Sequence, residues 1–237
     1  MVQVCLEVGP KATGAFLPAY PGCWVFGRNQ NAALGKAKEA ALAWHGWIRS
    51  HGEKVESPST IKTDPVEVMH VSYNPAEAGK PEPLFWSEIP AVSFRDVDRT
   101  LRLMRYSRSD LLGLCSNLDK PLLSWKPRSE PRSIANCLRH IAMAEWWYVT
   151  RLDIDLPRNF PTDVFELLAR NRHLAELSLV RLTEDQRRSV FQPENDPSPV
   201  CNLWTARKVL RRFVDHERLH TGYIKRIAAS YQFNSKS

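Results

Sequence analysis

The stretch Trp204–Ile227, WTARKVLRRFVDHERLHTGYIKRI, carries the pattern that decides the fold of this chain. Val209 and Phe213 recur at the four-residue spacing of an amphipathic helix. His216 and His220 share that spacing and therefore lie one turn apart on the same apolar face. An imidazole nitrogen that is buried without a partner costs on the order of 2 kcal/mol, and a metal ion shared by both rings would remove that cost. The H-x-x-x-H pair is a common way to present two nitrogens to one ion, so a metal site is one interpretation, and core histidines satisfied by hydrogen bonds are the other.

Three further segments upstream show the same periodicity: Asp96–Leu118, Ser133–Leu152 and Asp163–Leu182. Four amphipathic helices of about 20 residues, joined by loops that contain proline, predict an up-and-down four-helix bundle over residues 95–237. The first and third connections are long enough for one crossover. His140 lies in the second helix on the flank of its apolar face, where it could meet the fourth helix.

The first 73 residues have a different pattern. Short apolar or β-branched runs bounded by Gly and Pro predict four strands, Val2–Val8, Ala15–Leu17, Cys23–Gly27 and Val66–Tyr73. Between the last two strands a helical pattern begins after Asn29, a suitable N-cap, and ends near Gly52. We therefore predict an α+β chain, with a β-β-β-α-β domain over residues 1–73 ahead of the all-α bundle. Residues 74–94, rich in proline, are predicted to be a linker.

Composition places the chain among ordinary globular proteins, with 43% hydrophobic and 25% charged residues in a length of 237. No apolar run approaches the roughly 20 residues that span a bilayer, so we expect no membrane association. The N-terminus shows no secretory signal. Five scattered cysteines without a C-x-x-C pair indicate reduced thiols and a cytoplasmic location.

Charge is divided unevenly between the two halves. Residues 1–92 hold 8 basic and 9 acidic side chains, and residues 93–237 hold 25 and 17. A basic half can attract nucleic acid, and Arg207, Lys208, Arg211 and Arg212 could form such a patch. No aromatic residues are interleaved with them for stacking, so we interpret these four residues as a solvated helix face. Asp215 is likewise expected to be solvated.

Residues 14–53, GAFLPAYPGCWVFGRNQNAALGKAKEAALAWHGWIRSHGE, resemble a HicB-type antitoxin domain. The features that carry the resemblance are the strand, the Pro21-Gly22-Cys23 turn, the next strand and the Ala/Glu-rich helix, and it covers about residues 2–72. Domains of this type usually continue into a DNA-binding segment, and nothing after residue 73 resembles one. We therefore expect no sequence-specific DNA binding, and the domain could instead bind a protein or RNA partner.

Trp125, the run SEPRSIANCLRHIAMAEWW at residues 129–147 and the stretch quoted first together resemble the DinB-like bundle superfamily over about residues 96–230. Members carry one histidine in the second helix and H-x-x-x-H in the fourth, which together bind a divalent ion, usually zinc or nickel. His140, His216 and His220 fall on those three places. The resemblance thus implies a three-histidine metal site, against the alternative of three core histidines satisfied by hydrogen bonds.

A carboxylate near the apolar face of the second helix, Glu145, is the candidate catalytic residue. It could act as a general base or accept a hydrogen bond from a ligand histidine. The alternative is a buried ion pair with an arginine, and Glu217 beside His216 has the same two interpretations. Cys137, one turn before His140, is expected to be a small core residue.

Two functions from different classes follow from these features. The first is a metal-dependent transferase, similar to the thiol S-transferases of the DinB-like bundles, or a hydrolase. Its expected partners are a small-molecule substrate, a thiol among the candidates, and a second copy of the chain in a homodimer. The second is a non-enzymatic interaction module in which the metal ion is structural. Fold alone does not choose between them, because one fold hosts many functions.

Overall fold

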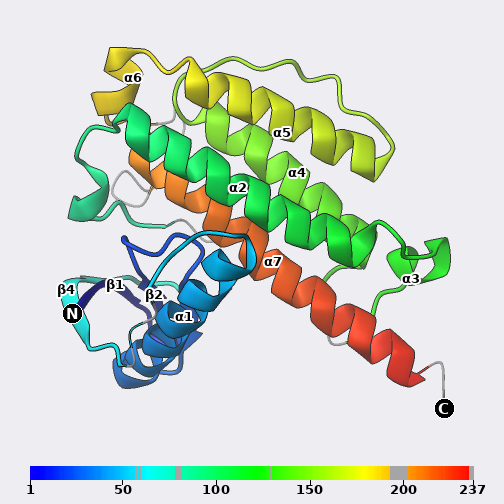
Figure 1. The fold of residues 1–237 in the computed structure, drawn as a ribbon, viewed down its shortest axis with the longest axis horizontal. Helices are drawn as coiled ribbons and strands as arrows, with labels where there is room; N and C mark the ends of the chain where they lie inside the picture. The colour runs from blue at the N-terminus through cyan, green and yellow to red at the C-terminus, as the bar shows by residue number, and fades with distance from the viewer. Residues whose placement is uncertain (57, 59, 78–81, 129, 193–201, 235–237) are drawn as a thin grey trace.

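The computed structural model describes residues 1–56, 58, 60–77, 82–128, 130–192 and 202–234. The chain begins with three strands, β1 (Val2–Val8), β2 (Thr13–Phe16) and β3 (Trp24–Gly27), followed by helix α1 (Gln30–Ser50) and strand β4 (Thr63–His70). The predicted β-β-β-α-β order is confirmed (Figure 1). Strand β4 starts three residues earlier than its apolar pattern indicates, because its register is fixed along β1 from the Val2–Thr63 pair to the Val8–His70 pair.

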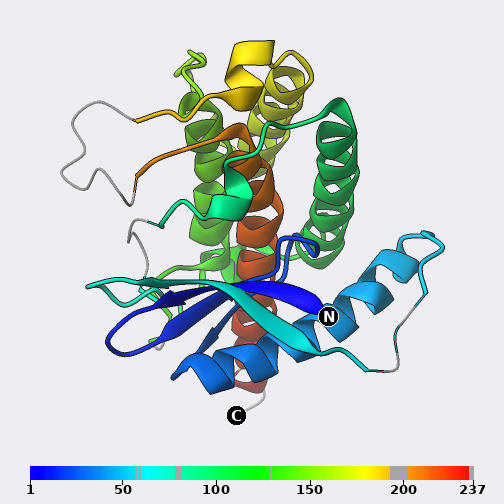
Figure 2. The same cartoon turned by 90° about the vertical axis from the view of Figure 1, so that its left-hand side faces the viewer.

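The four strands form one sheet in the order β3-β2-β1-β4. β1 and β2 are antiparallel, as are β2 and β3, whereas β4 runs parallel to β1. Because side chains alternate along a strand, Val4 and Leu6 of β1 share one face, which packs with the alanines of α1. The opposite face presents Cys5 and Glu7, and both are buried. The sheet therefore has cover on both faces, with α1 on one side and the bundle on the other (Figure 2).

The described part of the second half contains four long helices: α2 (Phe94–Cys115), α4 (Ile134–Thr150), α5 (Val164–Val180) and α7 (Ala206–Asn234). The bundle is confirmed. Three short helices were not predicted: η1 (Trp86–Glu88), α3 (Lys120–Ser124) and α6 (Glu184–Arg188). Across the described ranges, no helix combines the length and apolar character needed to span a bilayer.

The path of the chain through the bundle differs from a simple up-and-down order. α7 packs on α2 and α4, and α5 packs on the same two helices. Figure 1 shows that α2 and α7 run in one direction and α4 and α5 in the other, so the order is up-down-down-up. The crossover is therefore the second connection, residues 151–163, which runs the length of the bundle. We predicted it in the first or third connection because those are longer in sequence. The first connection contains the short helix α3 and the third contains α6, so part of the length of each connection is folded into a helix and does not extend along the bundle.

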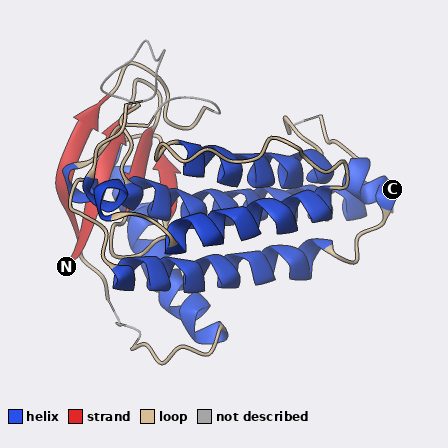
Figure 3. Ribbon diagram, turned by 90° about the horizontal axis from the view of Figure 1, so that it is seen from above, coloured by secondary structure: helices blue, strands red, loops and turns tan. Residues whose placement is uncertain are grey.

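The sheet lies at one end of the bundle (Figure 3). It contacts the first half of α7, where the Gly22 N–H donates to Asp215. Phe85, 1% exposed, packs on Phe16 of the sheet with ring centroids 5.4 Å apart. The Thr205 hydroxyl donates a hydrogen bond of 2.8 Å to the Glu88 carbonyl. The segment predicted to be a linker is thus packed between sheet and bundle where it is described. The division into domains at residues 1–73, 74–94 and 95–237 stays a prediction.

Candidate metal centre

Local sequence signals place the three histidines. Helix α4 begins after Ser133, whose hydroxyl accepts a hydrogen bond from the Asn136 N–H, and His140 lies two turns into that helix. α7 supplies His216 and His220, one turn apart, each 7% exposed. His140 is half-buried, as expected of its flank position. Since α4 packs against α7, the three side chains meet at the interface of these two helices.

The three imidazole rings form a close triangle. Ring centroids are 4.8 Å apart for His140 and His216, 4.7 Å for His140 and His220, and 4.4 Å for His216 and His220. One ring nitrogen from each residue lies within 4.8 Å of the other two. Within the described ranges this is the single group of three or more potential ligands, and it consists of the three residues that the sequence predicted.

The electrostatic environment keeps all three rings neutral. Burial lowers the pKa of His140 to about 4 and that of His220 to about 3, and it lowers the pKa of His216 well below its usual value. Nearby positive charges, including those of Arg132 and Arg212, act in the same direction. A neutral imidazole keeps a lone pair on one nitrogen, which is the form that binds a metal ion.

Two observations show that the nitrogen atoms of these three histidines fit a metal ion. His220 Nδ1 is buried and has no hydrogen-bond partner among the described residues. His140 Nε2 and His216 Nε2 are 3.1 Å apart. Two nitrogens bound to one tetrahedral zinc ion, each at about 2.0–2.1 Å, would be roughly 3.3 Å apart. A hydrogen bond between the two rings also accounts for 3.1 Å, but it leaves His220 Nδ1 unsatisfied. A shared ion could satisfy all three rings.

Tyr148 and Arg212 support this triangle, and we did not predict either residue for the site. The Tyr148 ring packs edge-on against His216 at 5.8 Å, and the Arg212 guanidinium donates to the Tyr148 hydroxyl at 2.8 Å. Tyr148 follows His140 by eight residues and lies about 80° further round α4, so both rings can contact His216 of α7. That spacing was the available sequence signal. The contacts fix the position of the His216 ring.

Glu145, the predicted catalytic residue, is 2% exposed and lies in an ion-pair network. Its Oε1 accepts hydrogen bonds from Arg108 Nη2 at 3.0 Å and Arg172 Nε at 2.9 Å. Glu217 Oε1 accepts from Arg108 Nε at 2.6 Å, and Oε2 pairs with Arg172 at 2.8 Å. Although burial opposes its ionisation, Arg172 and Arg108 hold the pKa of Glu217 below its usual value. The buried ion-pair interpretation describes both carboxylates. A catalytic role for Glu145 stays a prediction.

Three of the four basic residues of α7 that we predicted to form a solvated face are buried, whereas Arg207 is half-buried and pairs with Asp96. Lys208 is fully buried, and Arg211 and Arg212 are 9% and 7% exposed. The cause is the cover provided by the sheet and by the segment that contains Glu82 and Glu88. Arg212 pairs with Glu82 at 2.7 Å, and Arg211 pairs with Glu88 at 2.7 Å. The periodicity of α7 could not reveal that a second surface packs against this helix, because that surface is built from residues more than a hundred positions away in the sequence.

Asp215 was also predicted to be solvated and is 3% exposed. It accepts a hydrogen bond of 2.5 Å from the Gly22 N–H and pairs with Arg211 at 3.0 Å. Burial raises the pKa of Asp215 although the Arg211 charge opposes that rise. Gly22 lies in the turn between β2 and β3, so this contact joins the sheet to the helix that carries the histidines.

Cys137, which we expected to be a small core residue, is buried in the core of the bundle. The four described cysteines are free, and Cys201 lies outside the described residues. His45 and His51 pack against aromatic rings, and His173 is exposed.

Comparison with known proteins adds the family. No curated protein and no solved structure matches the chain. The family match does not extend to residues 2–72, so the resemblance of that segment to HicB-type domains stays a prediction. The model of the DinB superfamily matches residues 103–224, which is slightly more than half of the chain and includes all three histidines. The chain therefore belongs to the DinB superfamily.

Proposed function

We propose that the chain binds one divalent metal ion, zinc or nickel, through His140, His216 and His220. We further propose that it is a metal-dependent enzyme acting on a small molecule, either a transferase similar to thiol S-transferases or a hydrolase. The observation that carries the proposal is the grouping of three ring nitrogens within 4.8 Å of one another on two facing helices. Membership of the DinB superfamily supports the same conclusion.

Three histidines leave a divalent ion with at least one open position, which favours a catalytic site over a structural one. When bound, such an ion would supply Lewis acidity, which lowers the pKa of a water molecule or a thiol at that position. The residues of the chain have separate tasks. Burial keeps the three imidazoles unprotonated, and Tyr148 with Arg212 holds the His216 ring in place. His140 is the most accessible of the three, so a substrate would approach from its side.

The second candidate is an interaction module with a structural ion. The observation that favours it is the contact of the sheet with α7, through the Gly22–Asp215 hydrogen bond and the packing of Phe16 on Arg211, because a metal ion that ties α4 to α7 would also stabilise the helix on which the sheet rests. A structural zinc site is usually closed by four protein ligands. The described residues supply three, which favours the enzyme.

Metal analysis of the purified full chain tests the proposal. We expect about one equivalent of zinc or nickel per chain, and less than half an equivalent in His216→Ala after exhaustive dialysis. The matched control is His173→Ala, which removes an exposed histidine from α5 and should keep the full equivalent. Full metal content in His216→Ala would show that the ligand assignment is wrong.

Cobalt substitution separates the two candidate functions. An open position should admit an added thiol, and a thiolate-to-cobalt charge-transfer band should then appear in the near ultraviolet. A cobalt spectrum that does not respond to thiols, azide or cyanide would indicate a closed site and favour the structural role.

A further inference from the structure

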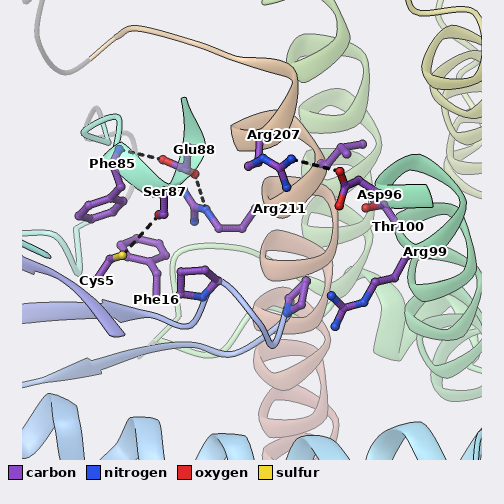
Figure 4. A pocket seen from close by; sticks show the side chains of 13 residues that line it. Cys5, Phe16, Phe85, Ser87, Glu88, Asp96, Arg99, Thr100, Arg207 and Arg211 are labelled. Carbon is purple, nitrogen blue, oxygen red and sulfur yellow. Dashed lines mark hydrogen bonds and ion pairs between the residues drawn. The ribbon is translucent and has the colours of Figure 1, made fainter. Parts of the chain in front are cut away.

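A cavity of about 110 Å³ lies where the sheet meets α2 and α7 (Figure 4). The three guanidinium groups that line it have partners within the protein. Arg211 pairs with Glu88 at 2.7 Å. Arg207 pairs with Asp96 at 3.1 Å, and Arg99 donates to a backbone carbonyl at 2.8 Å. Within the described residues, the lining of this cavity therefore offers no unmet charge that would select a ligand.

The surface beside the three histidines is different, because a large aromatic side chain is exposed there. Trp147 is 38% exposed, and it follows His140 on α4 by seven residues. Seven residues make nearly two helical turns, so the two side chains lie within about 20° of each other around α4 and about 10 Å apart along its axis. His140 is the most accessible of the three histidines. The exposed parts of His140 and Trp147 therefore lie on the same side of α4.

The helix surface between these two residues is apolar and is formed by small or flexible side chains. Ala144 lies one turn after His140, and Met143 precedes it; both are half-buried. Glu145 is 2% exposed and belongs to the buried ion-pair network, so it brings no charge to this surface. The methyl group of Ala144 is much shorter than the rings of His140 and Trp147. A ligand bound at the histidines could therefore extend across Ala144 to the indole.

The indole of Trp147 is held in place by its neighbours although much of it is exposed. The Trp204 ring packs against it with centroids 5.1 Å apart and the two planes at 90°. The guanidinium carbon of Arg151 lies 4.7 Å from the centre of the Trp147 ring. Trp204 is itself 3% exposed, so it is a fixed support. An aromatic side chain that is already ordered gives a ligand contact area at little cost in conformational entropy.

We propose that Trp147 is a specificity residue of the metal site, and that the substrate is a thiol whose sulfur lies about 10 Å from an aromatic or similarly flat apolar group. This inference rests on the proposed function, because it places the sulfur at the open position of the ion. The flat group packs on the exposed part of the Trp147 indole, in the offset or edge-on arrangement that aromatic pairs prefer. A small polar thiol binds the ion without reaching Trp147, so the indole discriminates between the two kinds of thiol.

Two thiols that differ in one group test the proposal on the cobalt-substituted full chain. N-(2-phenylethyl)-3-mercaptopropanamide and N-ethyl-3-mercaptopropanamide share the thiol and the amide, but only the first carries a ring. Titration followed by the thiolate-to-cobalt band gives a Kd for each. We expect the phenyl compound to bind at least about tenfold more tightly, because its ring buries apolar area and makes an aromatic contact. Trp147→Ala should lower this ratio to about two and leave the Kd of the ethyl compound unchanged, because the aromatic contact is lost.

Ala144→Leu is a second variant that removes no contact of Trp147 and introduces a good helix former, so it should fold even if Trp147→Ala does not. It raises the surface between the histidines and the indole, and it should also lower the ratio. 2-Mercaptoethanol, which is too short to reach residue 144, should bind both variants as it binds the wild type.

The matched control is Trp86→Ala, because Trp86 is 77% exposed and its backbone N–H is bonded to Glu67 of the sheet, so this variant should keep the wild-type ratio. The proposal is overturned by equal Kd values for the two thiols in the wild type, or by an unchanged ratio in Trp147→Ala or Ala144→Leu. A cobalt-loaded chain that gives no thiolate band with either compound would contradict the open metal position itself, so failure of the proposed function is recognised separately and this inference falls with it.

Discussion

Replacing Glu145 by glutamine separates a structural role from a catalytic one. In the bundle interior two arginines face two glutamates, and Glu145 accepts hydrogen bonds from Arg108 and Arg172. All four side chains are at most 10% exposed. Glu145→Gln keeps the shape of the side chain but removes its charge, so the buried cluster is left with a net charge of about +1.

The size of the effect follows from that imbalance. Breaking a buried ion pair by removing one partner typically costs about 3–5 kcal/mol. The glutamine carbonyl can still accept one arginine N–H, so we expect the lower end, about 3 kcal/mol. In a chain of this size each kcal/mol lowers Tm by roughly 2–4 °C, which predicts a drop on the order of 6–12 °C.

Urea unfolding followed by far-ultraviolet circular dichroism measures the loss, and metal content is determined on the same preparations. Glu39→Gln, at an exposed position of α1, is the matched control and should change the free energy of unfolding by less than about 0.5 kcal/mol. Adding Arg172→Gln to Glu145→Gln should cost less than the two single changes together, because the pair interacts. An unfolding free energy within about 0.5 kcal/mol of wild type, combined with an altered cobalt spectrum, would refute the structural role and place Glu145 at the metal.

Further predictions concern pH, a turn and nucleic acid. Burial raises the pKa of Glu7 to about 7, even though the Tyr73 hydroxyl donates to this carboxyl at 2.6 Å. The protonated Glu7 side chain therefore stabilises the fold fully below pH 4.5, and that stabilisation is lost as the pH rises through about 7. Glu7→Gln should therefore raise the free energy of unfolding by about 2–3 kcal/mol at pH 8 and leave it nearly unchanged at pH 4.5. Equal changes in the free energy of unfolding at the two pH values would contradict this. Gly22 has φ +93°, and an added Cβ would lie 2.4 Å from the side chain of Arg218. Gly22→Ala should therefore lower Tm in thermal unfolding. Gly35→Ala is the control and should not lower Tm, because a Cβ at Gly35 would meet open space. The full chain should show no sequence-specific DNA binding in competition assays at about 150 mM salt; a preference of roughly 10³-fold for its own promoter would overturn this.

Local signals in the sequence were sufficient to predict the strands and the long helices and to pair two of the three histidines. Asn29, Ser133 and Asp163 each accept a hydrogen bond from the first turn of the helix that follows, so these helix starts could be predicted within a residue or two. His216 and His220 could be paired because four residues make about one helical turn. His140 was harder, since its flank position is ambiguous on a helical wheel, and the family pattern was needed to select it.

Non-local contacts account for what could not be predicted. Lys208, Arg211 and Asp215 have the charge and spacing of an exposed helix face, and they are buried because the sheet and the segment that contains Glu82 and Glu88 cover them. The cavity beside Arg99 likewise exists at the junction of three distant segments. The two sides of such an interface come from segments that are far apart in the sequence. Composition and periodicity, which describe neighbouring residues, therefore do not predict it.

The burial of α7 on both sides has an electrostatic consequence for fragments of this protein. Lys208 donates to the Glu82 carbonyl, Arg212 pairs with Glu82 and Arg211 pairs with Glu88, and both glutamates lie in the segment that covers α7. A bundle expressed from residue 93 onward would lose Glu82 and Glu88 and expose a cationic ridge along its longest helix. Such a fragment should be retained more strongly than the full chain on heparin or a cation exchanger, and its attraction to polyanions would reflect the missing sheet and not a property of the intact molecule.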